Sequence, residues 1–550
     1  MLFFVTHEAI SQTWNATIEV TEPRTNIYKW DDKTFKERVN AGKKAALFYP
    51  VDVSDLMIPY RPLKAYFETT PNDPVRKLIF ELTQTITNFK SMDDVFGWLG
   101  THKFPEDEIQ LEFPDTLPHL SAEEKELTMG ATIIHTKNGE ALTFGCAACH
   151  SHDLFGVKVL GLTNRFPRAN EFFRYGQQFA PYVNSFIFKD LLQTTEGERL
   201  MMVDAKNAVR WVGTKKPQAV GLDTSLAQVA LSLSKRGLDE YATKHAFWAD
   251  FPRPNRLSKR IADSKPAVWW NVKYKNRWLS DGSIISGNPI HTNFLWNEIG
   301  RGTDLKKLEI WLNENQKTIE NLTASVFATQ APRYENFFGE NAIDLSKAQR
   351  GQKHFIQSCQ KCHGTYQKGW DLPEADKLSK TEKIKTINLF YHKITPVIDV
   401  GTDPGRYEGM KAFYKDLNRL KISKTINTVV QPQKGYVPPP LEGIWARWPY
   451  FHNNSAPSLC AVLTAGKDRP KTYWAGEAKD KERDFDQECN GYPLGDNTPE
   501  EWKKDKDFLY NTKLEGLSNL GHDEGVFLKN GKEIYSFDEK LELVEFLKTL

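Results

Sequence analysis

Hydrophobic and polar positions recur with helical spacing in several separate parts of the chain. Ala348, Gly351, Phe355 and Ile356 have the spacing of one helix face, and they lead directly into a cysteine at position 359. Ser121 with the acids after it is typical of a helix start, and Phe537 begins an amphipathic stretch near the end. The helices expected on these patterns lie at residues 75–96, 121–135, 221–233, 345–358 and 537–550.

These elements favour a mainly α fold of more than one domain. Residues 1–120 are punctuated by prolines and carry no chemical motif, so we expect an N-terminal extension packed on the domain that follows. Residues 121–340 and 341–550 are expected to form two further domains, each with long, loop-rich insertions. The length of 550 residues is too great for one compact core and agrees with this division.

Composition narrows the functional class only a little. Hydrophobic residues make up 40% and charged residues 26%, which is ordinary for a globular protein and excludes wholesale disorder. The formal net charge is +2, so nothing predicts binding to a nucleic-acid backbone. No apolar run approaches the roughly 18 residues that a transmembrane helix needs, so no such segment is expected.

Four of the six cysteines lie in two identical motifs. Cys146-Ala-Ala-Cys149-His150 is the first, and Cys359-Gln-Lys-Cys362-His363 is the second. C-x-x-C-H is the attachment pattern of c-type haem: two thiols bond the haem vinyl groups, and the next histidine supplies the proximal iron ligand. A redox dithiol or half of a zinc site is the alternative, but two copies with the histidine argue against it. We therefore predict two covalently bound haem c groups, one in each of the two later domains.

Haem attachment of this kind also predicts the compartment. The start of the chain, residues 1–8, does not read as a signal peptide, so the chain is either cytoplasmic or a processed or truncated form. Because bacterial c-type haem is attached outside the cytoplasm, we expect a periplasmic or secreted protein. In an oxidising compartment Cys460 and Cys489 are most simply a disulfide, and two buried free thiols are the alternative.

The residues around the second motif resemble a known family. The segment from Val437 to Leu459 resembles the corresponding segment of bacterial di-haem cytochrome c peroxidases and their relatives, in which Gly401-Thr-Asp-Pro also occurs. The chain length, Lys265-Pro-Ala-Val-Trp-Trp and Ser518-Asn-Leu-Gly-His522 are more similar to the rubber oxygenase branch. The resemblance extends from about residue 125 to the end of the chain.

The resemblance implies that the two haems have different roles. The haem at the first motif, with His150 as proximal ligand, is expected to react with oxygen or peroxide, and the other to relay electrons. His363 and His522 match the two axial ligands of the relay haem in the rubber oxygenases. Peroxidases place a methionine there instead, and Met410 is the methionine that follows Cys362.

Other candidate residues carry a structural alternative beside the functional one. His452 and Arg447 are expected near the second haem, His452 as a supporting group and Arg447 as a partner of a haem propionate. Trp269 and Trp270 are either core residues or electron carriers beside the reactive haem. His291, with its neighbours Phe294 and Trp296, is a candidate for the distal pocket. His152 is expected to be exposed.

Three readings of the function remain open at this stage. The first is an oxidoreductase that activates O2 and acts on an apolar, unsaturated substrate. The second is a peroxidase that reduces hydrogen peroxide with electrons from a small donor protein. The third is a di-haem electron carrier in which neither iron has a free coordination position. No acid is marked as the group that would cleave an O–O bond, and a calcium ion between the domains is a further possibility that the resemblance implies.

Overall fold

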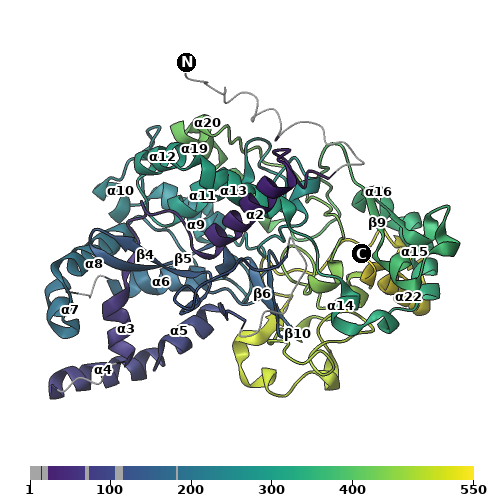
Figure 1. Cartoon of the computed structure of the whole chain (residues 1–550), viewed down its shortest axis with the longest axis horizontal. Coiled ribbons are helices and arrows are strands. Elements are labelled where there is room, and N and C mark those ends of the chain that lie inside the picture. Colours follow the sequence, from purple (N-terminus) through teal and green to yellow (C-terminus); the bar gives the residue numbers. More distant parts are fainter. Residues whose placement is uncertain (1–13, 15–22, 69–72, 106–114, 181–183, 224) are drawn as a thin grey trace.

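The computed structural model describes residue 14 and residues 23–68, 73–105, 115–180, 184–223 and 225–550 (Figure 1). Residues 1–8, which bear on a signal peptide, lie outside the described residues. Helices outweigh strands, which agrees with the expected mainly α fold. The α-helices are α2 Asp32–Leu47, α3 Tyr60–Glu68, α4 Pro74–Thr87, α5 Met92–Leu99, α6 Ala169–Phe179, α7 Ser185–Leu192, α8 Glu196–Val209, α9 Ser225–Ser234, α10 Ala246–Asp250, α11 Pro289–Gly300, α12 Leu305–Glu314, α13 Gln316–Ala328, α14 Tyr334–Phe338, α15 Leu345–Ser358, α16 Gln360–His363, α17 Lys380–Lys385, α18 Gly405–Gly409, α19 Tyr414–Arg419, α20 Lys421–Thr425, α21 Leu459–Val462 and α22 Phe537–Lys548.

The strands form small antiparallel sheets that connect the helical parts. Among the described residues the largest sheet has three strands, in the order β1-β5-β4, and the others are two-stranded. Their bounds are β1 Ile58–Pro59, β2 His102–Lys103, β3 Thr128–Met129, β4 Ala131–Thr136, β5 Gly139–Phe144, β6 Ser151–Leu154, β7 Val157–Leu160, β8 Thr365–Lys368, β9 Ile387–Phe390, β10 Thr472–Trp474, β11 Leu509–Asn511, β12 Leu528–Lys529 and β13 Lys532–Glu533.

The first part of the chain packs on the region that follows it. Asp31 caps α2 by accepting hydrogen bonds from the backbone of Lys33 and Thr34. Helix α2 then crosses α13 closely, because a Cβ at Gly42 would lie only 1.9 Å from the carbonyl oxygen of Asn321. The helix expected over 75–96 is two helices, α4 and α5, since Asn88 adopts a φ of 59° and Ser91 starts α5 with a capping box. Figure 1 shows α3, α4 and α5 extending away from the body of the molecule.

The segment before the first motif is not the helix that we expected over 121–135. Residues 122–125 form turns, and residues 131–136 form strand β4, which pairs with β5. Four of the six residues in this strand are β-branched (Thr132, Ile133, Ile134 and Thr136), which favours a strand over a helix. Gly130, with φ of 90°, lets this sheet approach the motif, because a Cβ there would lie 2.1 Å from the backbone nitrogen of Ala148.

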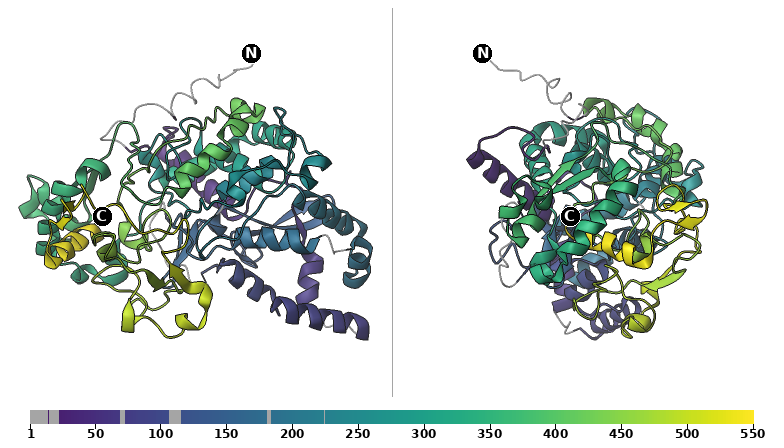
Figure 2. Two further views of the ribbon diagram at one scale, coloured as in Figure 1. Left: turned by 180° about the vertical axis from the view of Figure 1, so that it is seen from behind. Right: turned by 90° about the vertical axis from the view of Figure 1, so that its right-hand side faces the viewer.

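The second motif follows a helix, as expected. Helix α15 runs into α16, which holds Cys362 and His363, and α15 crosses α22 near the chain's C-terminal end (Figure 1 and, from behind, Figure 2). The crossing is tight, since a Cβ at Gly351 would lie 1.9 Å from the carbonyl oxygen of Glu542. Phe355 and Phe546 fill the contact with ring centroids 5.2 Å apart. The expected helices over 221–233 and 537–550 are present as α9 and α22.

Two large hydrophobic clusters form the core, and each draws on distant segments. One contains Leu47, Leu308 and Met410, and the other contains Trp270 and Phe355. Both clusters therefore include residues from more than one of the expected segments, and the boundaries near 120 and 340 stay predictions. The disulfide between Cys460 and Cys489 is present, which confirms the pairing over two free thiols.

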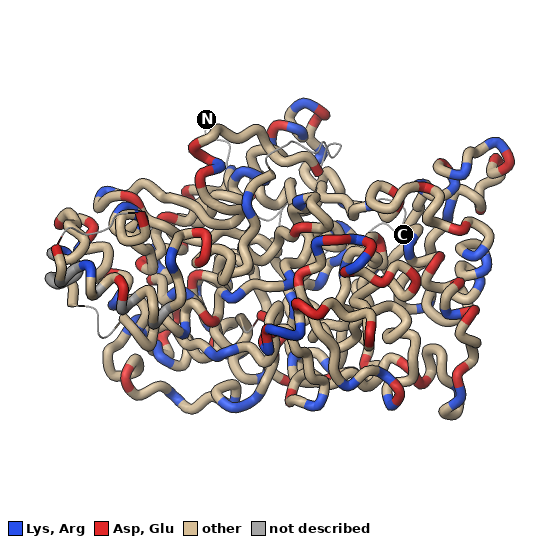
Figure 3. Tube along the Cα trace, turned by 90° about the horizontal axis from the view of Figure 1, so that it is seen from below, with Lys and Arg blue, Asp and Glu red and all other residues tan. Residues whose placement is uncertain are grey.

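Charged residues of both signs are interspersed along the described trace (Figure 3). Among the described helices, none is long and apolar enough to cross a membrane.

Candidate functional site

One cavity of about 580 Å³ is lined by both cysteine motifs. The lining includes three residues of the first motif, Cys146, Cys149 and His150, and three of the second, Cys359, Cys362 and His363. The two motifs are 213 positions apart in the sequence, but their residues line the same cavity.

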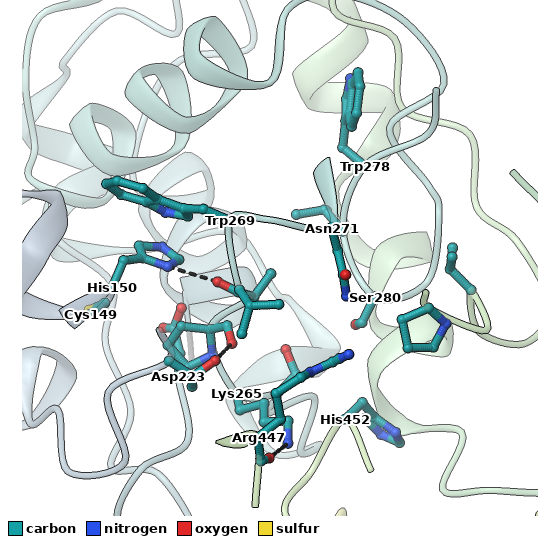
Figure 4. Close-up of a pocket in the computed structure, with 18 of the residues that line it drawn as sticks. Cys149, His150, Asp223, Lys265, Trp269, Asn271, Trp278, Ser280, Arg447 and His452 are labelled. Carbon is teal, nitrogen blue, oxygen red and sulfur yellow. Dashed lines mark hydrogen bonds between the residues drawn. The ribbon is translucent and has the colours of Figure 1, made fainter. Parts of the chain in front are cut away.

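 The sequence motifs therefore belong to one site, and Figure 4 shows part of the space around it.

The first motif holds its histidine in a fixed tautomer. Cys146–Ala148 is a short 3-10 helix, and the backbone nitrogen of His150 bonds to the carbonyl of Cys146. The His150 Nδ1–H donates to the carbonyl oxygen of Ala267 at 2.9 Å, which leaves Nε2 as the acceptor (Figure 4). Burial lowers the pKa of His150 to about 4, so the ring is neutral at neutral pH. A neutral imidazole with a free Nε2 is the form that ligates iron.

The second motif repeats this arrangement. The His363 Nδ1–H donates to the carbonyl oxygen of Pro439 at 2.8 Å, and burial lowers the pKa of His363 to about 4. Pro439 belongs to the segment that resembles di-haem cytochromes. The motif and that segment are therefore joined by the bond that sets the tautomer of the histidine.

His522 faces His363 at the spacing that a shared metal ion requires. The two ring centroids are 6.3 Å apart, and both residues line the cavity. An imidazole nitrogen lies about 2.0–2.1 Å from a first-row metal ion, so two rings on opposite sides of one ion have centroids about 6 Å apart. The His522 Nδ1 has no hydrogen-bond partner, and its φ of 54° is a sparsely populated conformation. These features fit a ligand of the second haem.

Met410, the alternative ligand, lies elsewhere. It is fully buried within the hydrophobic cluster that also contains Trp296 and Phe413. It is not among the residues that line the cavity. The structure thus brings His522 to the second motif and leaves Met410 in the core.

Lys265, Lys275 and Arg447 are among the cations that line the cavity without a carboxylate partner. Among the described residues, no ion pair within 4.0 Å involves Lys265, Lys275 or Arg447. Lys265 and Arg447 donate to backbone carbonyls, Arg447 to Pro440 at 3.0 Å. Burial lowers the pKa of Lys275 to about 7 and that of Arg447 to about 10. Partly buried cations are stabilised by nearby anions, and the propionates of a bound haem would supply them.

The predicted aromatic residues divide between the cavity and the core. Trp269 lines the cavity, and its ring centroid lies 5.7 Å from that of His150 (Figure 4). Trp270 does not line the cavity; it is fully buried, and its indole N–H donates to the carbonyl oxygen of Glu442 at 2.9 Å. His291 is likewise absent from the lining, whereas Phe294 and Trp296 contribute to it.

His452 lines the cavity and stacks on Tyr436, with ring centroids 4.0 Å apart. Its Nε2 is buried without a hydrogen-bond partner, and burial lowers the pKa of His452 to about 3. Arg447 and Lys265 lie near it in Figure 4. This position fits the supporting role that we expected for His452.

His152 is not exposed, contrary to expectation. It is 1% exposed, its Nδ1 lies 3.2 Å from Nε2 of His102, and its Nε2 lies 3.0 Å from a guanidinium nitrogen of Arg165. Arg165 also donates to the carbonyls of Ala446 and Trp448. The β6-β7 hairpin turns His152 inward, so this side chain joins the two motif regions instead of facing solvent.

Some cavity residues carried no signal in the sequence. Asp223 precedes α9 and lines the cavity, and burial raises the pKa of its carboxyl group. Lys275 is a further example, because it belongs to no motif. The described residues contain no group of three or more His, Cys, Asp or Glu side chains that could hold a metal ion, and the calcium ion stays a prediction.

Comparison with known proteins supports a cytochrome of the c type. Residues 435–475 match a family model described as RoxA-like, cytochrome c-like. The chain is also similar to the uncharacterized protein y4iJ of Sinorhizobium fredii, with 28% identity over 500 residues that span 76% of this chain and 78% of that protein. A second protein of that organism, the uncharacterized y4iM, is 28% identical over 248 residues, 38% of this chain and 49% of its own length.

The matched segment includes the residues that position the second site. Pro439 accepts the bond from His363, Arg447 and His452 line the cavity, and all three lie within residues 435–475. The match points to a c-type cytochrome with covalently bound haem and to haem-dependent oxidoreductase activity in general.

Proposed function

We propose that the protein is an extracytoplasmic oxidoreductase with two c-type haems, which activates O2 at the first motif and oxidises an apolar, unsaturated substrate. The observation that carries the proposal is the shared cavity, into which two motif histidines with the same carbonyl-held tautomer are directed. Bound haem would supply the oxygen chemistry and the electron transfer at the iron.

At the second motif, the side chains present would hold a haem and supply two ligands to its iron. Cys359 and Cys362 would anchor the haem, and His363 and His522 would ligate the metal from opposite sides. A site with two protein ligands has no position for substrate, so its role is to take up and release electrons. Arg447 and Lys275 would neutralise the propionates.

At the first motif, the chain supplies one axial ligand and an apolar wall. Cys146 and Cys149 would anchor the haem, and His150 would ligate it. Helix α11 presents Ile290, Phe294 and the amide-bearing Asn293 and Asn297 to the cavity. This face offers no histidine, cysteine or methionine as a second ligand, and its apolar side chains would exclude water and orient an apolar substrate.

The test compares the holoprotein, matured with its haems, with and without candidate substrates. We expect a high-spin signal from the first haem and oxygen consumption with an olefinic polymer or an unsaturated lipid, together with carbonyl products in mass spectra. A saturated polymer of similar length is the matched control and should give no products. Two low-spin haems with no oxygen consumption would contradict the proposal and would favour the electron carrier.

Asp223 is the observation that favours a peroxidase as the second candidate. It is a partly buried acid in the cavity, and its raised pKa would let it hold a proton for transfer to a peroxide oxygen. In that case the holoprotein should reduce hydrogen peroxide with electrons from a small reduced cytochrome. Asp223→Asn should then lower the rate about 10²–10⁴-fold, as expected for loss of a positioned acid. An unchanged rate in this variant would remove the support for this candidate.

A further inference from the structure

A buried phenol and a buried carboxyl group form a pair beside the first motif. Tyr49 follows α2, is 1% exposed, and donates its phenolic O–H to Oε1 of Glu298 at 2.5 Å. Glu298 is fully buried on α11, and its other oxygen accepts a hydrogen bond from Thr303. This pair had no signal in the sequence, because its two members are 249 positions apart.

The pair lies at the wall of the haem cavity. Tyr49 lines the cavity together with Cys146 and Phe294, and the rings of Tyr49 and Phe294 have centroids 5.8 Å apart. A Cβ built on Gly145 would lie 3.2 Å from the backbone nitrogen of Tyr49, so the tyrosine is directly beside the loop that begins the motif. Arg301 covers the other part of the ring, with its guanidinium carbon 4.3 Å from the ring centroid.

The position of the carboxyl group matters for the oxidation of the phenol. A buried phenol that loses an electron must also lose its proton, and it can do so readily only to a base within hydrogen-bond reach. Burial, followed by the neighbouring Glu298, raises the pKa of Tyr49, so the phenol keeps its proton until it is oxidised. Glu298 provides the base at the required distance.

Other tyrosines at the cavity lack such a base. Tyr436 donates its hydroxyl to the carbonyl oxygen of Asp403 at 2.5 Å, and Tyr450 donates to carbonyl oxygens at 3.3 Å. A backbone carbonyl accepts a hydrogen bond but does not take up a proton. Among these three cavity tyrosines, Tyr49 is the one paired with a carboxyl group.

We propose that Tyr49 is a redox-active residue that gives an electron to the first haem site and passes its phenolic proton to Glu298. The step rests on the proposed function for the haem at the first motif, and its oxidant is a peroxide, which takes electrons from that haem beforehand. The phenolic O–H bond breaks and an O–H bond forms on the Glu298 carboxylate; the products are a neutral phenoxyl radical and a neutral carboxylic acid. Tyr49 would thereby draw an oxidising equivalent away from the haem when no substrate is bound.

The test is freeze-quench electron paramagnetic resonance of the holoprotein after mixing with hydrogen peroxide. Haem content is first established by intact mass, and the protein is labelled with ring-deuterated tyrosine. We expect a radical signal that narrows on deuteration, disappears in Tyr49→Phe and persists in the matched control Tyr436→Phe. Glu298→Gln keeps a hydrogen-bond acceptor but no base, so formation of the radical should slow about 100-fold.

The outcomes separate this inference from the proposed function. A chain that binds no haem at the first motif contradicts the proposed function before the radical is measured. A chain with both haems that gives no tyrosyl radical, or the same radical in Tyr49→Phe, overturns the role of Tyr49 alone. If Tyr49→Phe fails to load haem, the Glu298→Gln variant decides, and an unchanged rate of radical formation in it overturns the proposal.

Discussion

At the scale of single residues, the site depends on histidines that burial keeps neutral. The pKa values of His150 and His363 fall to about 4, and those of His452 and His522 to about 3. In each motif histidine a backbone carbonyl fixes the proton on Nδ1. The two motif histidines therefore already have the neutral form that the proposed role as iron ligands requires.

The ligand assignment at the second site gives the first prediction. His522→Ala should remove one axial ligand of the second haem and convert its low-spin signal to high spin in electron paramagnetic resonance. Met410→Leu is the matched control; it replaces a core side chain by one of similar volume, should cost less than about 1.5 kcal/mol in stability, and should leave the signal unchanged. A low-spin signal that survives in the first variant and vanishes in the second would reverse the assignment.

The second prediction concerns the effect of His452 on the stability of the fold at acidic pH. Burial lowers the pKa of His452 from its usual 6.5 to about 3 in the folded chain, so between these values the unfolded chain binds the extra proton. The free energy of unfolding should therefore fall as the pH drops from 6.5 towards 3, by about 1.4 kcal/mol per pH unit for this one group. The free energy of unfolding of His452→Gln, measured with denaturant between pH 7 and pH 4, should fall less steeply with falling pH. The difference in slope should correspond to the uptake of one proton on unfolding. Equal slopes in the two proteins would count against a buried, neutral His452.

At the scale of elements, two different supports hold the two motifs. Helices α15 and α22 cross at Gly351 behind the second motif, whereas a small sheet approaches the first motif at Gly130. The sequence predicted α15 and α22 because their apolar positions have one clear helical period. It did not predict β4, since the acids after Ser121 resemble a helix start and the competing run of β-branched residues is short.

The disulfide provides a prediction at this scale. Cys460 lies on α21, whose Leu459 and Val462 line the cavity, and Cys489 follows 29 positions later. Closing a loop of this length should stabilise the fold by about 3–4 kcal/mol through the unfolded chain. The double variant Cys460→Ser, Cys489→Ser should lose that amount in denaturant unfolding. Breaking the bond with a reductant in the parent chain should have the same effect, and no loss in either case would show that the loop is held by other contacts.

The candidate site was predictable only where its residues lie in short motifs. The cysteines, His150 and His363 follow from local spacing, and His522 follows from a resemblance. Asp223, Lys275 and the pairing of Tyr49 with Glu298 arise from tertiary contacts between distant segments, which no local pattern encodes. His152 failed as a prediction for the same reason, because its partners His102 and Arg165 lie on other elements.

At the scale of the whole molecule, the shared cavity joins the two halves of the chain. Arg165 bonds to the carbonyls of Ala446 and Trp448, and Lys265 bonds to that of Arg447, so the region after the first motif is tied to the segment after the second. Both large hydrophobic clusters also draw on distant segments. We therefore expect the two haem sites to form together as one unit, not as separate modules.

Covalent attachment of two haems is tested most directly by the intact mass of the denatured protein after expression with a c-type haem maturation system. We predict a mass increase equal to two haem groups, with one group lost in Cys146→Ala, Cys149→Ala and one lost in Cys359→Ala, Cys362→Ala. A mass equal to the unmodified chain, or to the chain with a single haem, would contradict the central claim that both motifs of this chain carry covalently bound haem.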